Sequence, residues 1–497
     1  MRPCFLLEPL EPRLTLSAGF IAADGIPGGA VTLNLGHQLN YPSFAFQPDG
    51  GIILADSEYT NDCSGCGYIV RFNSDGSRDL TFGDKGVARV PYYHDIDNLL
   101  SKPDGKFLAF SWSAIYQFNS DGHPDTSFMP AHFGADSHIG DAAIAPDGGL
   151  ILAGQDWSNA IELPSGDLAS HLALYRLNGD GTRDRSFGNR GIIQRQYAAP
   201  FAWAGYSVVA PDGKILVDAF DYLDEDDLKP ATLLRFNPDG TPDQSFATNG
   251  RFHFSAGEHD GPILLQPDGK IIQILNGDSG LSMLRLLPDG TLDTSFGEHG
   301  RARYSWDASE ESDRWEWAFL QPDGKILAVS EGNVVARLNP DGTLDSTFAF
   351  GGAMRVVSPD PRFDLWSESA TLRPDGHLLL SFTKVSLGGK HNLDLISEHL
   401  LDISTDDAAS SLDRSADGNF LLLEEHLQPS PPISTSTDQA ALPEIADSNP
   451  ASSNDPFDVS WVAESQSTDD TPNSQDSIWN DSDDPFADNP QAEPWLP

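Results

Sequence analysis

The fold is decided by the stretch QPDGKILAVS at residues 321–330, followed by ARLNPDGTLDSTF at residues 336–348. Asp-Gly between apolar runs supplies the positive φ of a tight hairpin turn, and the preceding Pro presets the turn. The run Ile326, Leu327, Ala328 and Val329 is apolar without interruption. Such a run fits a strand that is covered on both faces. The stretch therefore predicts a hairpin, a third strand and a second Asp-Gly turn that ends in an aromatic anchor.

This unit recurs along most of the chain. The hairpin appears seven times at spacings of about 55 residues, beginning at residues 47, 102, 145, 210, 266, 321 and 373. The second element follows the first six hairpins, beginning at residues 71, 117, 176, 235, 285 and 337. Its anchors are Phe82, Phe128, Phe187, Phe246, Phe296 and Phe348. We expect these rings to fill equivalent wedges between neighbouring sheets.

A short strand usually follows each anchor, so each unit holds about four strands. Four strands repeated around an axis predict an all-β fold, a β-propeller. We expect seven four-stranded blades over residues 20–425, closed by pairing of the N-terminal segment 28–35 with the last unit. The segment SADGNFLLLEE, residues 415–425, is either an eighth partial copy or the closing strand, which leaves six or eight blades as alternatives.

The paired motifs resemble the delta-sixty repeat family of bacterial β-propellers over residues 20–425. Two units depart from the pattern: the second lacks the Gly after its Phe, and the seventh lacks its second turn. The resemblance implies a propeller of extracellular or surface proteins. It carries no established catalytic residues, so no catalytic residue is assigned.

The leader, residues 1–19, contains LEPLEPRLTLSA at residues 7–18. Glu8, Pro9, Glu11, Pro12 and Arg13 interrupt the apolar segment that a secretory signal needs. The segment resembles the LEPR-XLL motif of planctomycete secreted and surface proteins, with Thr15 where Leu is usual. That resemblance implies export from a bacterial cell. The alternative is a disordered N-terminus.

The C-terminal segment, residues 426–497, differs in composition. It is rich in Ser, Asp, Pro and Asn, and the chain contains no Lys or Arg after Arg414. Low hydrophobicity with uncompensated charge predicts a disordered acidic tail. Its motifs NDPFDVSW and DDPFADNPQAEPW could dock on a partner; the alternative is a solubilising tail with incidental aromatics.

Charge excludes some partners. The formal net charge of −45 repels phosphate backbones, so we expect no nucleic acid. No run of about 18 apolar residues occurs, which predicts no membrane insertion. We expect a monomer.

Two further groups are candidates for metal or redox chemistry. The loop DYLDEDD contains five carboxylates that could share a Ca²⁺ ion, although an exposed charge run is the simpler interpretation; they are Asp221, Asp224, Glu225, Asp226 and Asp227. Cys63 and Cys66 form a single C-x-x-C pair, which is weak evidence for zinc. Outside the cell a small loop disulfide is expected, and otherwise two idle thiols. No other cofactor is expected.

The topology indicates where a ligand would bind. The two Asp-Gly turn types should lie on one face of the ring, and the connections of variable length on the other. That second face should carry five tryptophans, Trp157, Trp203, Trp306, Trp315 and Trp366. Aromatics beside carboxylates suit protein or sugar recognition. The alternative is that some of them pack loops.

Two functions remain open. The first is a non-catalytic recognition or structural module that binds a protein or glycan. The second is a propeller enzyme of the lactonase, glycosidase or quinone-dependent dehydrogenase type, which needs carboxylates or a metal in the central channel. The groups that line the channel would discriminate between them.

Overall fold

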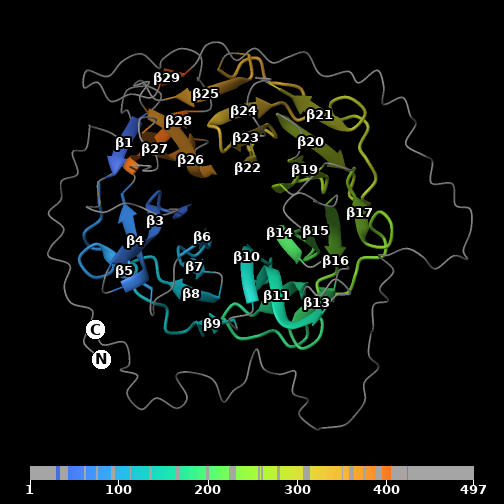
Figure 1. Cartoon of the computed structure of the whole chain (residues 1–497), viewed down its shortest axis with the longest axis horizontal. Coiled ribbons are helices and arrows are strands. Elements are labelled where there is room, and N and C mark those ends of the chain that lie inside the picture. Colours follow the sequence, from blue (N-terminus) through green and yellow to red (C-terminus); the bar gives the residue numbers. More distant parts are fainter. Residues whose placement is uncertain are drawn as a thin grey trace, which may run out of the picture.

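The computed structural model describes most of the repeat region. It covers residues 29–33, 43–60, 63–73, 77–90, 96–111, 113–133, 137–162, 168–196, 201–222, 231–255, 258, 261–276, 280–305, 314–349, 351–357, 363–372, 377–386, 395–404 and 422–423. All regular elements within these ranges are β-strands or isolated bridges, and they form a ring (Figure 1). The all-β propeller prediction is confirmed. The leader, residues 1–19, and the acidic tail, residues 426–497, lie outside the described residues.

Six sheets are built from four strands that follow one another in the chain, and they are named here as blades 1 to 6. Blade 1 contains β2 (Ser43–Phe46), β3 (Ile52–Thr60), β4 (Cys63–Phe72) and β5 (Val87–Arg89). Blade 2 contains β6 (Asn98–Ser101), β7 (Phe107–Ser111), β8 (Ala114–Phe118) and β9 (Ala131–His132). Blade 3 contains β10 (Ser137–Ile144), β11 (Leu150–Glu162), β12 (Leu168–Leu177) and β13 (Ile192–Gln196).

The next three blades repeat this order. Blade 4 contains β14 (Phe201–Val209), β15 (Ile215–Tyr222), β16 (Thr232–Phe236) and β17 (Arg251–His253). Blade 5 contains β18 (Ile263–Leu265), β19 (Ile271–Leu275), β20 (Leu281–Leu286) and β21 (Arg301–Tyr304). Blade 6 contains β22 (Trp315–Leu320), β23 (Ile326–Ser330), β24 (Val334–Leu338) and β25 (Ala353–Val357). Within each blade all pairings are antiparallel.

The expected blade count needs a correction. The sequence predicts seven equivalent blades, whereas six have this organisation. The seventh hairpin copy supplies β26 (Phe363–Leu372) and β27 (His377–Ser386) to a composite sheet with β28 (Leu395–Ser404) and β1 (Gly29–Leu33). β1 pairs with β28 antiparallel, so the two ends of the repeat region meet in this sheet. The seventh copy differs because its second Asp-Gly turn is missing from the sequence.

The segment at residues 415–425 also departs from the expectation. Leu422 and Leu423 form β29, which pairs with Val357 and Val356 of β25. β29 thus adds a fifth strand to blade 6 instead of starting an eighth blade or closing the ring.

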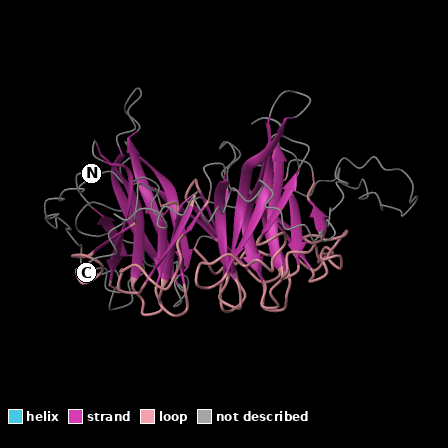
Figure 2. Cartoon of the chain, turned by 90° about the horizontal axis from the view of Figure 1, so that it is seen from below, coloured by secondary structure: helices cyan, strands magenta, loops and turns pink. Residues whose placement is uncertain are grey.

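Both types of Asp-Gly turn lie on one face of the ring, as predicted, where Figure 2 shows the described loops together below the strands. The side chain of Arg71 connects the two types within blade 1. Its Nη2 lies 2.5 Å from Asp49 Oδ2 in the hairpin turn, and its Nη1 lies 2.6 Å from Asp79 Oδ2 in the second turn. This face is named the turn face, and the opposite one the loop face.

The six anchor phenylalanines are buried, which confirms their expected role as wedges; they are Phe82, Phe128, Phe187, Phe246, Phe296 and Phe348. Phe82 of blade 1 packs in one cluster with Phe107 and Phe118 of blade 2. The ring centroids of Phe82 and Phe107 are 6.1 Å apart. Each anchor therefore joins its own blade to the next.

The anchor rests on the Asp-Gly turn of the following blade. Gly290 has φ +85°, and a Cβ added there would lie 2.7 Å from the backbone N of Ala247 and from the ring of Phe246. The Ala247 N–H donates to the carbonyl of Asp289 (2.7 Å). The same backbone bond joins four other turns; its donors are Gly83, Met129, Gly188 and Gly297, and its acceptors are Asp121, Asp180, Asp239 and Asp341. Glycine is thus required here by both conformation and space.

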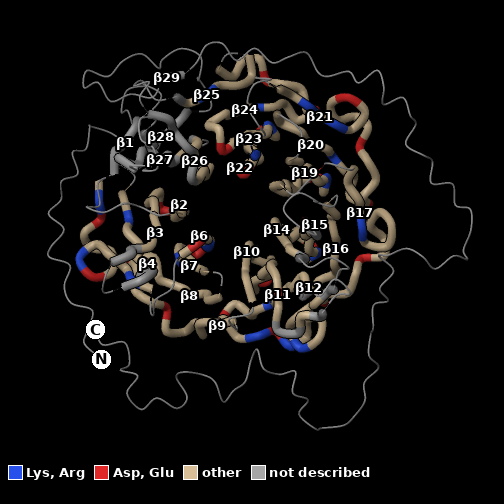
Figure 3. Tube along the Cα trace, in the orientation of Figure 1, with Lys and Arg blue, Asp and Glu red and all other residues tan. Residues whose placement is uncertain are grey.

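Each anchor is flanked by a charged network. In blade 4, Asp243 Oδ2 lies 2.8 Å from Arg235 Nε and 2.9 Å from Lys214 Nζ. Ser245 donates its backbone N–H and its hydroxyl to Asp243 Oδ1 (3.0 and 2.6 Å). The guanidinium carbon of Arg235 lies 4.3 Å from the centroid of the Phe246 ring. The Arg–Asp–Phe group recurs in blades 5 and 6, and Figure 3 shows both signs of charge interspersed along the outer turns.

Burial alone would raise the pKa of Asp243. The hydrogen bonds from Ser245 and Lys214 and the charge of Arg235 outweigh burial and hold the pKa well below its usual range. Asp243, which lies between the Asp-Gly turn and the anchor, is therefore a structural acceptor.

Replacing Gly290 by Ala should destabilise the ring by about 2–4 kcal/mol, because positive φ and overpacking against Phe246 both cost free energy. Gly148→Ala is the matched control: Gly148 has φ +83° with no atom within 4 Å of the added Cβ. Only the conformational cost of about 1–2 kcal/mol is expected there. Urea unfolding of both variants measures the difference, and equal losses would contradict packing of the anchor against the turn.

Asp243→Asn should cost about 2–4 kcal/mol at pH 7, because Arg235 and Lys214 lose a buried counter-charge. The folded pKa of Asp243 lies below the unfolded value of 3.8, so its contribution is present above pH 4 and is lost on acidification. The difference in melting temperature between wild type and variant should therefore become smaller below about pH 4. Asp268→Asn, at a side chain that is 58% exposed, should cost no more than about 1 kcal/mol.

Candidate functional site

The first strand of each blade lines the centre of the ring (Figure 1). These inner strands run from the loop face to the turn face. Register shifts interrupt four of them near the loop face: β10 between Ile139 and Asp141, β14 between Ala204 and Ser207, β22 between Trp315 and Trp317, and β26 between Ser367 and Ser369. A β-bulge frees backbone groups and redirects side chains. The strands that line the ring centre are therefore irregular near the loop face, unlike the edge of a regular sheet.

Polar side chains satisfy backbone groups near the start of these strands. Ser207 of blade 4 donates its backbone N–H and its hydroxyl to Asp141 Oδ2 of blade 3 (2.6 and 2.8 Å). Similar bonds join other neighbours; the backbone N–H of Ile96, Gly261 and Trp315 donates to Ser57 Oγ (3.0 Å), Asp218 Oδ2 (3.1 Å) and Asn276 Oδ1 (2.8 Å). Blades are thus joined by anchors near the turn face and by polar caps near the loop face.

The pKa of Asp141 is raised, whereas the pKa of a motif aspartate such as Asp243 is lowered. Burial raises its pKa to about 6, and the hydrogen bonds from Ser207 and from the Ala142 N–H offset only part of that effect. Its role as a cap between blades 3 and 4 explains why a carboxylate is kept at this cost.

One polar contact joins blades that are not neighbours. The Tyr206 hydroxyl on β14 donates to Glu316 Oε2 on β22 (2.7 Å), and blade 5 lies between them. Arg314 Nε lies 2.8 Å from Glu316 Oε1. The side chains of Glu316 and Arg314 are 22% and 49% exposed, so solvent reaches this group. Tyr206, Glu316 and Arg314 are named here the ring-centre group.

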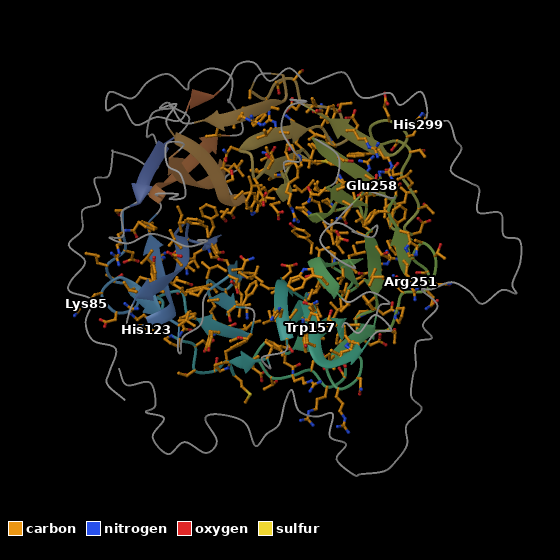
Figure 4. All side chains as sticks on the ribbon, viewed as in Figure 1. Lys85, His123, Trp157, Arg251, Glu258 and His299 are labelled. Atoms are coloured by element: carbon orange, nitrogen blue, oxygen red, sulfur yellow. The ribbon has the colours of Figure 1, made fainter. Side chains whose placement is uncertain are left out.

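The structure describes the side chains of three of the five predicted tryptophans. Trp157 on β11 and Trp203 on β14 are half-buried, and Figure 4 shows Trp157 beside blade 3. Trp315 is only 1% exposed and packs in the core of blades 5 and 6, so packing accounts for it and the expectation of a surface position is corrected. Trp366 lies on β26, but its side chain, like Trp306 as a whole, is outside the described residues.

Trp203 packs closely on the neighbouring blade. A Cβ added at Gly140 of β10 would lie 2.4 Å from Trp203 Cζ2. Gly140 therefore makes room for the indole next to Asp141. Trp203 and the ring-centre group share β14, which places an aromatic side chain on the strand that supplies Tyr206.

The other predicted groups are described only in part. Asp221 lies at the end of β15, while its side chain and Asp224, Glu225, Asp226 and Asp227 lie outside the described residues. Cys63 and Cys66 both lie on β4, with side chains outside the described residues. Within the described part of the chain, no three His, Cys, Asp or Glu side chains are grouped to hold a metal ion. No helix in that part is long and apolar enough to cross a membrane.

Sequence reasoning missed Asp141, Tyr206 and Glu316. A usable signal was present: the sixth residue before the hairpin Pro is Gly140, Gly205 or Gly261 in blades 3 to 5, inside otherwise strand-like runs. An isolated Gly in a strand marks a bulge or a close backbone approach. Blade 6 has Glu316 at this position.

These features define an all-β propeller whose blades are joined by repeated turn motifs. Four of its repeats, residues 47–82, 210–246, 266–296 and 321–348, match the family described as "Domain of unknown function (DUF5122) beta-propeller". The match supports a β-propeller fold for these repeats. No curated protein matches the sequence.

Several solved structures are similar to this chain at low identity and low TM-score. A Bacteroides caccae protein of unknown function is 13% identical, with 56% of this chain and 89% of that chain covered and a TM-score of 0.34. A Dyadobacter fermentans protein of unknown function is 13% identical, covering 76% and 98%, with a TM-score of 0.39. A glucose dehydrogenase is 16% identical, covering 61% and 96%, with a TM-score of 0.36. These likenesses do not distinguish catalysis from binding.

The Asp141 cap predicts a distinct pH dependence. Because the folded pKa of about 6 exceeds the unfolded 3.8, this group favours the folded state most below pH 4, and the benefit is lost as pH rises to 6. Asp141→Asn keeps an acceptor for Ser207 and should stabilise the protein by about 1–3 kcal/mol at pH 7, with no gain at pH 4. Thermal melts at both pH values measure this. Asp141→Ala, which leaves the Ser207 N–H without its acceptor, should instead destabilise at both.

Proposed function

We propose that this protein is an exported, non-catalytic recognition propeller that binds a protein or glycan through its loop face. The observation that carries the proposal is how three of the described carboxylates are used. Asp141 accepts from Ser207, Asp218 accepts from Gly261 and Gln273, and Glu316 accepts from Tyr206. They lie on three different strands, β10, β15 and β22.

The enzyme alternative makes a different demand. A lactonase, glycosidase or quinone-dependent dehydrogenase needs acid–base groups or a metal that converge on one reacting atom. Asp141 and Asp218 cap backbone N–H groups of a neighbouring blade, so these two carboxylates instead serve assembly. A recognition surface needs only rigid support for side chains and loops, and the two levels of blade-to-blade contact supply it.

Finer parts of the proposal concern architecture and location. We propose that the composite sheet acts as the seventh blade and closes the ring through the β1–β28 pairing. The repeats are proposed to belong to the delta-sixty type, and the leader at residues 1–19 to be an LEPR-XLL export signal, which gives a secreted or cell-surface bacterial protein. The protein is proposed to act as a monomer, with the acidic tail as a solubilising or docking segment.

Two elements of the loop face remain part of the proposal. The carboxylates of residues 221–227 would hold Ca²⁺ between blade 4 strands, and Cys63 and Cys66 would form a loop disulfide after export. Trp157, Trp203, Trp306 and Trp366 are the proposed aromatic ligand contacts. Trp315 is left out because it is buried.

The purified full chain should bind at least one component of a bacterial envelope extract or a glycan array, with and without 1 mM Ca²⁺ compared side by side. Binding without turnover of the bound component supports recognition. Release of a modified product from lactone, glycoside or sugar substrates would favour the enzyme. Failure to bind any component would overturn the recognition function.

Removal of residues 1–19 should retain the protein inside the cell, whereas the intact chain should reach the surface or medium. Cell fractionation with an antibody to the propeller measures this. The substitution Arg13→Ala within the leader provides a smaller perturbation. Equal distribution of all forms would contradict the proposed export signal.

A further inference from the structure

We propose that the ring-centre group is a binding site for an uncharged glycan. The inference rests on the proposed recognition function and assigns it a place and a ligand class. Its starting point is the hydrogen bond of 2.7 Å between Tyr206 and Glu316.

The contact does not serve to seal a blade interface. Neighbouring blades are already joined by the anchor bonds and the polar caps. Tyr206 and Glu316 belong to blades 4 and 6, and the intervening inner strand β18 has only three residues. Gly261 and Pro262 directly precede β18, and neither has a long side chain. The group therefore spans the space in front of blade 5.

Both partners project from interrupted strands. Tyr206 lies between Ala204 and Ser207 in the bulge of β14, and Glu316 lies between Trp315 and Trp317 in the bulge of β22. Bulges beside binding sites commonly redirect a side chain. Two separate bulges that aim side chains at the same point form a built arrangement, supported by rigid sheets on both sides.

The chemistry of the group fits hydroxyl groups. The Glu316 side chain accepts from Tyr206 and lies next to Arg314 Nε, a tyrosine hydroxyl can both donate and accept, and an arginine only donates. A sugar hydroxyl, like the tyrosine hydroxyl, both donates and accepts hydrogen bonds. Two vicinal hydroxyls of one sugar can therefore donate to Glu316 and accept from Arg314 at the same time.

Charge selects against anionic ligands. Glu316 and Asp141 lie in the ring centre, and the chain has a net charge of −45. Arg314 is already paired with Glu316 at 2.8 Å, so it offers no unbalanced positive charge. A sulfated or sialylated glycan would be repelled at long range and would place a second anion near two carboxylates. A neutral oligosaccharide has no charge, so it is repelled neither at long range nor by the carboxylates.

The test uses the full-length protein on an array of neutral oligosaccharides with sialylated and sulfated ones for comparison. Titration calorimetry then follows the best ligand with wild type, Tyr206→Phe and Glu316→Gln. We expect neutral glycans to bind, and both variants to weaken binding at least tenfold. Glu298→Gln, the same chemical change at an exposed turn residue next to His299 on the outer rim (Figure 4), should bind as wild type. Thermal melts confirm that each variant is folded.

The outcomes separate this inference from the proposed function. Binding of anionic glycans alone, wild-type affinity in both variants, or no glycan binding would overturn the ring-centre site. If an envelope protein is bound in any of these cases, recognition through the loop face still holds. If neither glycan nor envelope component binds, both proposals fail.

Discussion

The structure depends on the contact between the anchor phenylalanine of one blade and the Asp-Gly turn of the next. The contact combines ring packing, a backbone hydrogen bond and a glycine at positive φ, as at Phe246, Ala247 and Gly290. Each part limits the others, because a side chain at the glycine would push the ring away and lengthen the hydrogen bond. Since the same contact recurs around the ring, the angle between blades is set by a local motif rather than by a central core.

Part of the acidic composition is explained by hydrogen bonds and ion pairs that the motif aspartates make next to these contacts. Aspartates of the motif accept hydrogen bonds from the residue two positions on and from Arg and Lys of the same blade, as Asp243 does from Ser245, Arg235 and Lys214. Such acceptors are stabilised only while ionised. Asp141 is the exception, because burial outweighs its hydrogen bonds. Part of the excess of carboxylates therefore serves the turn face.

Sequence reasoning could predict the repeated part of this structure because local chemistry determines it. Asp-Gly turns, apolar runs and anchors such as Phe296 each leave a short-range pattern, and all of these were identified correctly. The blade count was less accessible, since the last sheet mixes strands from both ends and lacks one turn. The ring-centre group could not be predicted, because Tyr206 and Glu316 are 110 positions apart and meet only after two bulges and the ring geometry bring them together. Trp315 shows the converse. Its place at the end of a variable connection suggested a surface position, but it is the first residue of β22 and packs in the core of blades 5 and 6.

The pairing of β1 with β28 also has a consequence for how the chain reaches this structure. Leu33 pairs with Glu398, a separation of 398 − 33 = 365 residues, whereas every other strand pairing in blades 1 to 6 joins neighbours along the chain, apart from β29. Contacts of such high contact order are slow to form, because the loop entropy must be lost before the pairing contributes. A growing chain can therefore stack its blades progressively during synthesis, while β1 stays without its partner strand until β28 has been made.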